Sequence, residues 1–303
     1  MNHRRVLGRT QLKVNEIGFG TWAIGGNHSG WGYGATDDRT SIRALQTASD
    51  LGCNFFDTAD WYGHGHSEKL LGKALRKQRE EMILATKGGF DFYHGSARPN
   101  FNPDYLRFAL HQSLRRLGTD YIDIYQLHNP APEIIQDPEV ISELERFRSR
   151  GVVRWLGVSA ASVADACTAV EAGWADTVQV PFNLLASEAE FTVFPMAAEL
   201  GVGIIAREPL ANGFLTGKYG AASRFPAGDF RSQAHFDSLR TGIENAISSI
   251  RLYCADGETL AQLALRFVLE RQAVSVVICG CKTPAQVREN FSARRALSVQ
   301  LSK

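Results

Sequence analysis

The 303-residue sequence lacks the features that would place the chain in a membrane, outside the cell or on nucleic acid. It has no apolar run of the roughly 18 residues that a membrane-spanning helix needs. The amino-terminal segment carries charge but no apolar stretch of the kind found in secretory signal peptides. A net charge of +1 provides no electrostatic footprint for nucleic acid. We therefore expect a cytoplasmic location, without membrane or nucleic-acid partners.

Cysteine is scarce, and its pattern argues against disulfides and against a metal site. The five cysteines are odd in number and scattered along the chain, which favours reduced thiols. Cys279 and Cys281 are separated by one residue and could form half of a metal site. Because no second pair of cysteines or histidines lies near them in the sequence, we expect no metal there.

The sequence also lacks the G-x-G-x-x-G fingerprint of an open, doubly wound dinucleotide-binding sheet. The glycines in "GTWAIGGNHSGWG", which follow the first expected strand, have a different spacing. Instead, strand-like and helix-like segments alternate along the whole chain without a break in composition. Eight such units predict one α/β domain over residues 1–303, a (β/α)8 TIM barrel. The expected strands cover residues 16–22, 54–58, 82–87, 121–128, 152–159, 176–183, 202–207 and 274–280.

The segments between these strands fit the same fold. Alternating residues 4–7 and 11–14 around a Gly8-Arg9 turn predict an amino-terminal β-hairpin. Segment 208–236 is rich in Gly, Pro and Ser and too long for an ordinary connection, so it is expected to be a functional loop after the seventh strand. Ser67 is expected to cap the helix that it begins. The expected helices cover residues 38–51, 67–76, 103–116, 138–150, 162–173, 195–200, 237–254, 259–270 and 283–293.

Four polar residues follow three consecutive expected strands. Asp57 ends the second strand, Lys87 the third and His128 the fourth, while Tyr62 lies on the loop just beyond Asp57. The carboxyl ends of barrel strands share one face, and neighbouring strands lie ~5 Å apart, so the four side chains can converge. An acid, a phenol, an amine and an imidazole together make a proton-transfer site.

The acidities of these groups suggest their roles. A free phenol has a pKa of ~10 and is a poor proton donor near neutrality, but a neighbouring ammonium lowers that pKa. Asp57 would hold Lys87 charged and oriented beside Tyr62, and His128 would hydrogen-bond the oxygen of a substrate carbonyl. Such a set suits carbonyl reduction, in which a hydride reaches the carbon while Tyr62 protonates the oxygen.

With these residues in place, the sequence resembles the aldo-keto reductases of bacterial type over essentially its whole length. The resemblance implies a (β/α)8 barrel, NADPH-dependent reduction of an aldehyde, ketone or sugar-like carbonyl, and a catalytic tetrad of Asp57, Tyr62, Lys87 and His128. It also implies that Tyr62 is the general acid. The segments that carry the resemblance occur in order as "GFGTW", "NFFDTADWYG", "LATKGG", "LGTDYIDIYQLH", "GVVRWLGVS", "VQVPFNLL", "PLANGFLTGKY" and "GCKTPAQVREN".

The resemblance further implies where NADP(H) binds. Ser159 and Gln179 would hold the carboxamide, the loop after the seventh strand would wrap the pyrophosphate, and Lys282 would face a 2′-phosphate. A lysine next to a helix amino terminus is a suitable anion site on physical grounds alone. The implied cofactor-binding set comprises Gly20, Thr21, Trp22, Asp57, Ser159, Gln179, Arg207, Pro209, Leu210, Gly213, Lys218, Gly280, Lys282, Thr283, Gln286, Glu289 and Asn290.

Three positions depart from the family pattern. Ala160 stands where "GVSN" would place Asn, which removes one potential hydrogen bond to the carboxamide. Arg207 replaces an aromatic residue that stacks on the nicotinamide, and its planar guanidinium could stack or reach a phosphate instead. Glu208 replaces a serine and could pair with Arg207 or with another basic group.

Other interpretations of single features stay open at the level of sequence. The His64-Gly65-His66 segment is similar to the metal-binding pair of barrel hydrolases, but that pair should end the first strand, so we expect loop residues. Some aldo-keto reductase relatives are auxiliary subunits of potassium channels, so an NADP(H)-binding sensor with low turnover is the alternative function. Aromatic rim residues could line a substrate pocket or only pack over the barrel. The pocket candidates are Trp22, Trp31, Phe92, Tyr93 and Asn129.

Overall fold

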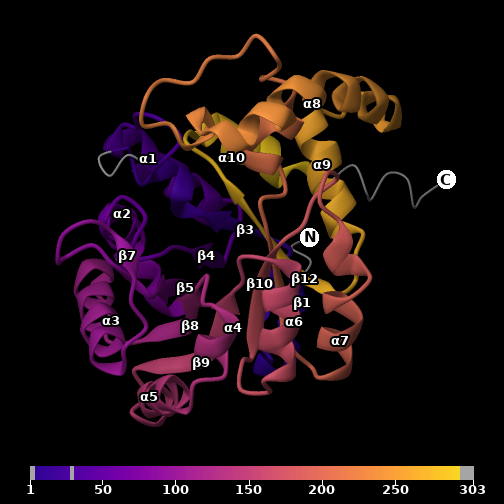
Figure 1. The fold of residues 1–303 in the computed structure, drawn as a ribbon. Coiled ribbons are helices and arrows are strands. Elements are labelled where there is room, and N and C mark those ends of the chain that lie inside the picture. Colours follow the sequence, from indigo (N-terminus) through magenta and orange to yellow (C-terminus); the bar gives the residue numbers. More distant parts are fainter. Residues whose placement is uncertain (1–3, 28–30, 294–303) are drawn as a thin grey trace.

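The computed structural model describes residues 4–27 and 31–293, and its centre is a closed barrel of eight parallel strands (Figure 1). The expected α/β barrel is therefore confirmed. Around the barrel each strand pairs with its neighbours in chain order, and β12 pairs with β3 to close the ring. The strands are β3 (Ile17–Gly20), β4 (Phe55–Asp57), β5 (Ile83–Gly88), β8 (Ile122–His128), β9 (Val153–Ser159), β10 (Thr177–Pro181), β11 (Gly203–Arg207) and β12 (Val274–Gly280).

Helices surround the barrel, and most begin at a polar side chain that caps their first turn. Asp37, Ser162 and Thr283 each accept a hydrogen bond from a backbone N–H of the helix that follows. No helix of the described residues is long and apolar enough to cross a membrane. The helices are α1 (Asp38–Asp50), α2 (His66–Leu75), α3 (Pro103–Leu117), α4 (Pro132–Ile135), α5 (Pro138–Ser149), α6 (Val163–Glu171), α7 (Val193–Glu199), α8 (Asp237–Ile250), α9 (Leu260–Leu269) and α10 (Pro284–Phe291).

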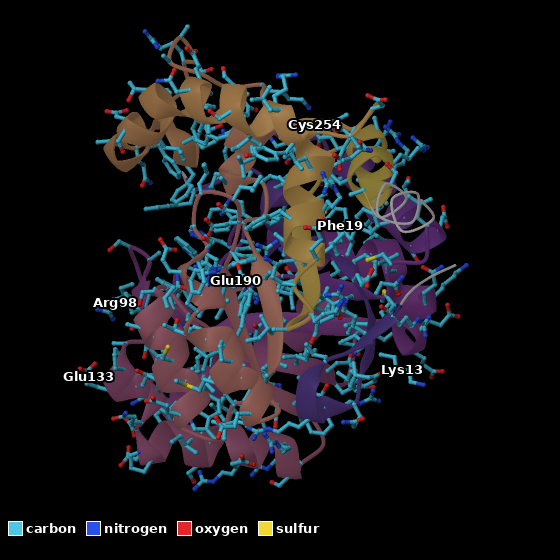
Figure 2. The ribbon with its side chains drawn as sticks, turned by 90° about the vertical axis from the view of Figure 1, so that its right-hand side faces the viewer. Lys13, Phe19, Arg98, Glu133, Glu190 and Cys254 are labelled. Carbon is cyan, nitrogen blue, oxygen red and sulfur yellow. The ribbon has the colours of Figure 1, made fainter. Side chains whose placement is uncertain are left out.

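Alternation along the strands divides the core into two parts. Phe55 packs inside the barrel, whereas Phe56 and Phe19 stack on its outer surface with ring centres 6.2 Å apart. Phe19, labelled in Figure 2, lies in the same fully buried cluster as Leu45 of α1. Because successive side chains of a strand point to opposite faces, residues two positions beyond an inner core residue also face the barrel axis. This rule positions the functional side chains.

The expected amino-terminal hairpin is present and closes the bottom of the barrel. β1 (Arg4–Val6) pairs antiparallel with β2 (Lys13–Asn15), and Leu7 inserts into the inner core. Arg5 donates hydrogen bonds to the carbonyls of Leu269 and Val274, at the end of α9 and the start of β12. Gly8, in the turn of the hairpin, allows the chain to pass close to the start of β11. A Cβ at this position would lie 2.3 Å from the backbone nitrogen of Gly203, and the φ of Gly8 is +50°.

Several local expectations differ from the structure. The first strand ends at Gly20, and Thr21–Ile24 form a 3-10 turn. Ser67 lies inside α2 rather than capping it: Gly65 is the N-cap, and the Ser67 hydroxyl donates to the Thr21 carbonyl at 2.7 Å. A small antiparallel pair, β6 (Phe90–Asp91) and β7 (Arg98–Pro99), had no sequence signal.

The long segment after β11 is more ordered than its composition suggests. It contains short 3-10 helices at Ala211–Thr216, Phe230–Ser232 and Ala234–Phe236. Phe214 and Phe236 of this segment form an apolar cluster with Ile243 of α8. Figure 1 shows the segment and α8 together at one end of the barrel. Because the segment packs around this apolar cluster, it keeps a defined conformation although its sequence shows no helical or strand periodicity.

Candidate active site

The four polar residues at strand ends converge because of strand period and register. Asp57 lies two residues after Phe55 in β4, and Lys87 lies two residues after Ala85 in the adjacent strand β5, so both occupy inner positions. His128 ends β8 opposite Ser159 of β9. Two-residue alternation therefore turns all of these side chains toward the barrel axis, above the inner core.

Lys87 is the centre of the site. Its Nζ donates to Asp57 Oδ1 at 2.5 Å, to the Thr58 carbonyl at 2.9 Å and to Tyr62 Oη at 3.1 Å. Lys87 and Asp57 are almost completely buried, and Tyr62 keeps only 9% exposure. Gln179 donates to the second oxygen of Asp57 at 2.7 Å. The ammonium is thus held by three acceptors and points one proton at the phenol oxygen.

Electrostatics set the protonation state of the pair. Burial acts to lower the pKa of Lys87, but Asp57 and Tyr62 outweigh it, so the pKa is raised and the amine stays charged. Burial raises the pKa of Tyr62, and the opposing effect of Lys87 does not cancel it. The ammonium acts on the phenol pKa in the expected direction, but desolvation is the larger effect, so the net shift is upward. Tyr62 is a neutral phenol whose proton can be donated.

His128 faces the same space as a neutral imidazole. Its ring centre lies 5.8 Å from that of Tyr62. Burial, then the charges of Lys87 and Arg207, hold the pKa of His128 well below its usual range. Nδ1 is enclosed and has no hydrogen-bond partner among the described residues. Since a buried N–H without an acceptor is costly, the single proton is favoured on Nε2, where it can be donated to a ligand.

A cavity of about 510 Å³ connects Tyr62 and His128 to the loop after β11 and to α10. Its size is that of a typical ligand site. Two expected cofactor residues do not line it: Thr21 is fully buried, and Thr283 caps α10. Lys87 is also absent from the lining, but it contacts Tyr62, which lines the cavity. The expected residues that line the cavity are Gly20, Trp22, Trp31, Asp57, Tyr62, His128, Asn129, Ser159, Gln179, Arg207, Pro209, Leu210, Gly213, Lys218, Gly280, Lys282, Gln286, Glu289 and Asn290.

Aromatic rings form the wall next to the tetrad. Trp22 and Trp31 line the cavity as expected for pocket residues, and so does Phe90, one of the aromatic rim residues that follow the expected strands. Trp61 and Phe230, which the sequence did not single out, complete the wall. Trp61 stacks on Phe90 with ring centres 4.8 Å apart. Trp61 directly precedes Tyr62 in the sequence, and this position could have identified it as a residue of the pocket wall.

Phe92 and Tyr93 do not line the cavity, contrary to the expectation. Phe92 stacks on His64 at 4.7 Å between ring centres, and Tyr93 accepts a hydrogen bond from Arg116. The short strand β6 causes this difference, because it carries the chain past Phe90 and away from the barrel axis. Phe90 therefore occupies the wall that was assigned to its neighbours.

Hydrogen bonds at Tyr33 link segments that are distant in sequence, and we call the contacts of Tyr33 with Asn212 and Lys282 the strap of the cavity. Tyr33 Oη donates to Asn212 Oδ1 at 2.5 Å, and the Lys282 ammonium donates to the Tyr33 carbonyl. Arg231 is buried, forms a two-bond ion pair with Asp229, and lies 4.8 Å from the centre of the Tyr33 ring. Both Tyr33 and Arg231 line the cavity, and neither was identified from the sequence.

Arg207 and Glu208 form an ion pair inside the cavity. Arg207 Nη2 also donates to the Ala160 carbonyl at 3.0 Å, so the side chain lies over the position where Asn was expected. Glu208 accepts a second hydrogen bond from Asn212 and has a φ of +57°. The pairing that the sequence left open is therefore between these two neighbours.

The remaining sequence candidates have structural roles. His66 begins α2 and contacts Asp38 with 2.9 Å between Nε2 and Oδ1. Cys281 accepts a hydrogen bond from Asn290 at 3.2 Å. Within residues 4–27 and 31–293, no group of three His, Cys, Asp or Glu side chains is arranged to hold a metal ion.

The lining residues fit a phosphate-bearing dinucleotide. Lys218, Arg231 and Lys282 give one part of the cavity a positive charge, and α10 begins beside Lys282. Burial, and then the charge of Arg231, lowers the pKa of Lys282. Arg231 is paired with Asp229, whereas Lys282 lies next to a helix amino terminus, a position suited to an anion.

Comparison with known proteins agrees with this geometry. The family model described as "Aldo/keto reductase family" matches residues 16–303. The chain is 31% identical to aldo-keto reductase YhdN of Bacillus subtilis over 92% of this chain and 84% of the relative. It is 33% identical to the aldo-keto reductase yakc [NADP(+)] of Schizosaccharomyces pombe, covering 95% and 85%. Among solved structures, aldo-keto reductase AKR11C1 from Bacillus halodurans (holo form) superposes with a TM-score of 0.79 at 29% identity, covering 97% and 91%.

Proposed function

The chain belongs to the aldo/keto reductase family, and from that premise we propose that it reduces an aldehyde, ketone or sugar-like carbonyl with NADPH. The observation that carries the proposal is the buried Lys87, which joins Asp57 to Tyr62 next to a cavity that His128 also lines. A proton-transfer role accounts for the concentration of polar groups at the floor of an aromatic pocket.

In this proposal each side chain of the tetrad has one task. Tyr62 donates its proton to the carbonyl oxygen, and the ammonium of Lys87, 3.1 Å away, stabilises the phenolate that remains. Asp57 keeps Lys87 charged. His128 donates from Nε2 to the same oxygen and so orients the carbonyl. Solvent then returns a proton to Tyr62, and the alcohol leaves.

The cofactor would supply the hydride for the carbonyl carbon, leaving an oxidised nicotinamide. Ser159 and Gln179 line the cavity near the tetrad and would hold its carboxamide, while Lys218, Arg231 and Lys282 would hold its phosphates. We favour NADPH over NADH because Lys282 lines the cavity beside the amino terminus of α10, where a 2′-phosphate could be held. Relatives are named for both cofactors: the S. pombe protein for NADP(+), and a methylglyoxal reductase of Escherichia coli, 29% identical over 98% of this chain, as NADH-specific.

The test is oxidation of NADPH, followed by its absorbance, with a panel of aldehydes, ketones and aldoses. Tyr62→Phe keeps the ring and removes the transferred proton, so kcat should fall by about 10²–10⁴-fold. The Kd for NADPH should change little, which controls for folding. Full activity of Tyr62→Phe would exclude the role of Tyr62 as general acid.

A second function is favoured by the names of two relatives, from S. pombe and Arabidopsis thaliana, as voltage-gated potassium channel beta subunits. A protein of S. pombe named as a voltage-gated potassium channel subunit beta is 31% identical over 95% of this chain. In a subunit of that kind the cavity would bind NADP(H) and turn over poorly. Tight NADP(H) binding with negligible oxidation by every carbonyl in the panel would favour this function over the first.

A further inference from the structure

Arg207 places a second positive charge at the reactive end of the cavity. It ends β11 at an inner position, two residues beyond Ile205 of the inner core, and lines the cavity with Tyr62 and His128. Only 20% of its side chain is exposed. The charge of Arg207 acts on both Tyr62 and His128. Its guanidinium is fixed by the Ala160 carbonyl and by Glu208, so the charge cannot turn away.

The chemistry of the proposed function brings the nicotinamide ring to the same place. Tyr62 and His128 hold the carbonyl oxygen, and the hydride must reach the carbon bonded to that oxygen. The ring that supplies the hydride therefore has to lie at the end of the cavity where Arg207, Tyr62 and His128 meet. The adenosine and its phosphates would then be held toward Lys282 and α10, which line the cavity as well.

The two redox forms of the cofactor differ in charge only at this ring. The oxidised nicotinamide carries a positive charge, and the reduced nicotinamide carries none. Lys87 also acts on Tyr62 and His128, but it does not line the cavity, and it is fully buried against Asp57 at 2.5 Å. Arg207 lines the cavity itself, and its partner Glu208 is 34% exposed, so water screens part of the compensating charge. A fixed cation in a partly enclosed site repels another cation much more strongly than water would allow.

We propose that Arg207 makes this site discriminate between redox forms, binding NAD(P)H more tightly than NAD(P)⁺, with Glu208 reducing the effect. This inference rests on the proposed function and adds a residue that acts on the cofactor rather than on the substrate. It favours the direction of carbonyl reduction, because the oxidised product leaves readily and competes poorly with fresh reduced cofactor. The cationic site at Lys282 cannot have this effect, since it meets the same phosphates in both forms.

The experiment measures the Kd of each redox form by quenching of intrinsic fluorescence, to which Trp22 and Trp61 of the cavity wall contribute. The quantity of interest is the ratio of the two constants, because damage to the adenosine or phosphate contacts affects both forms equally. In wild type the oxidised form should bind at least tenfold more weakly, which is ~1.4 kcal/mol. Arg207→Met should reduce the ratio about tenfold, and Arg207→Lys should keep it.

Glu208→Gln provides a test of opposite sign. Removing the carboxylate leaves the charge of Arg207 uncompensated, so the ratio should increase by threefold or more. An unchanged ratio in Arg207→Met, or a smaller ratio in Glu208→Gln, overturns the inference while leaving carbonyl reduction intact. If wild type binds neither redox form, with or without the 2′-phosphate, the proposed function fails as well.

Discussion

Replacing Lys87 by methionine should lower both the stability of the barrel and its activity. The substitution keeps most of the unbranched side chain and removes the ammonium that contacts Asp57, Thr58 and Tyr62. Asp57 then stays in the barrel as a buried carboxylate without its cation. Leaving one partner of a buried ion pair costs about 3–5 kcal/mol. Because the amides of Gln126 and Gln179 still donate to Asp57, we expect the lower end of that range.

The double variant Asp57→Asn/Lys87→Met separates the two effects. It removes both charges, and replacement of a whole buried pair is often neutral. We therefore expect urea unfolding, followed by circular dichroism, to return most of the lost free energy of unfolding. Activity should stay about 10²–10⁴-fold below wild type in both variants, because Tyr62 has no neighbouring ammonium. Wild-type stability of Lys87→Met, or a double variant no more stable than the single one, would refute this reasoning.

Three further predictions follow from other parts of the structure. Burial lowers the pKa of His128 in the folded chain, so the unfolded chain binds the proton first as the pH falls. The stability of the fold should therefore decrease as the pH drops below ~6.5, the ordinary pKa of histidine. Thermal unfolding at several pH values should show that His128→Asn has lost part of this acid sensitivity. Gly8→Ala should cost about 1–3 kcal/mol more than Gly228→Ala in urea unfolding, because both have positive φ but only Gly8 meets neighbouring backbone. Lys282→Met should raise the Kd for NADPH about tenfold and leave that for NADH nearly unchanged, as measured by titration.

The tetrad could be predicted from the sequence because its placement depends on short-range rules. Each residue follows an apolar run, and the ends of parallel strands share one face whatever the loops do. The period of two then explains why Asp57 and Lys87 both point inward above Phe55 and Ala85. For Asp57, Lys87 and His128 no knowledge of the loop conformations was needed, whereas Tyr62 lies on the loop after β4.

The strap and the exact pocket wall could not be predicted. The contact of Tyr33 with Asn212 joins residues 179 positions apart, and no local pattern encodes it. Phe92 and Tyr93 were assigned to the pocket from their position after the third strand, but a two-residue strand at Phe90 turns them outward. The direction of the Tyr62 pKa shift likewise depends on how completely the fold encloses the ring.

The pairing of β3 with β12, which closes the barrel, has a consequence for the synthesis of this protein. The first barrel strand hydrogen-bonds to the last, and Arg5 is held by carbonyls of Leu269 and Val274. A ribosome adding ~5–20 residues per second needs roughly ten to fifty seconds to supply that last unit. Until then β3 is an apolar strand with an open edge, the kind of surface that nascent chains pair wrongly. Completion of the fold is therefore expected only after the carboxyl-terminal quarter has emerged.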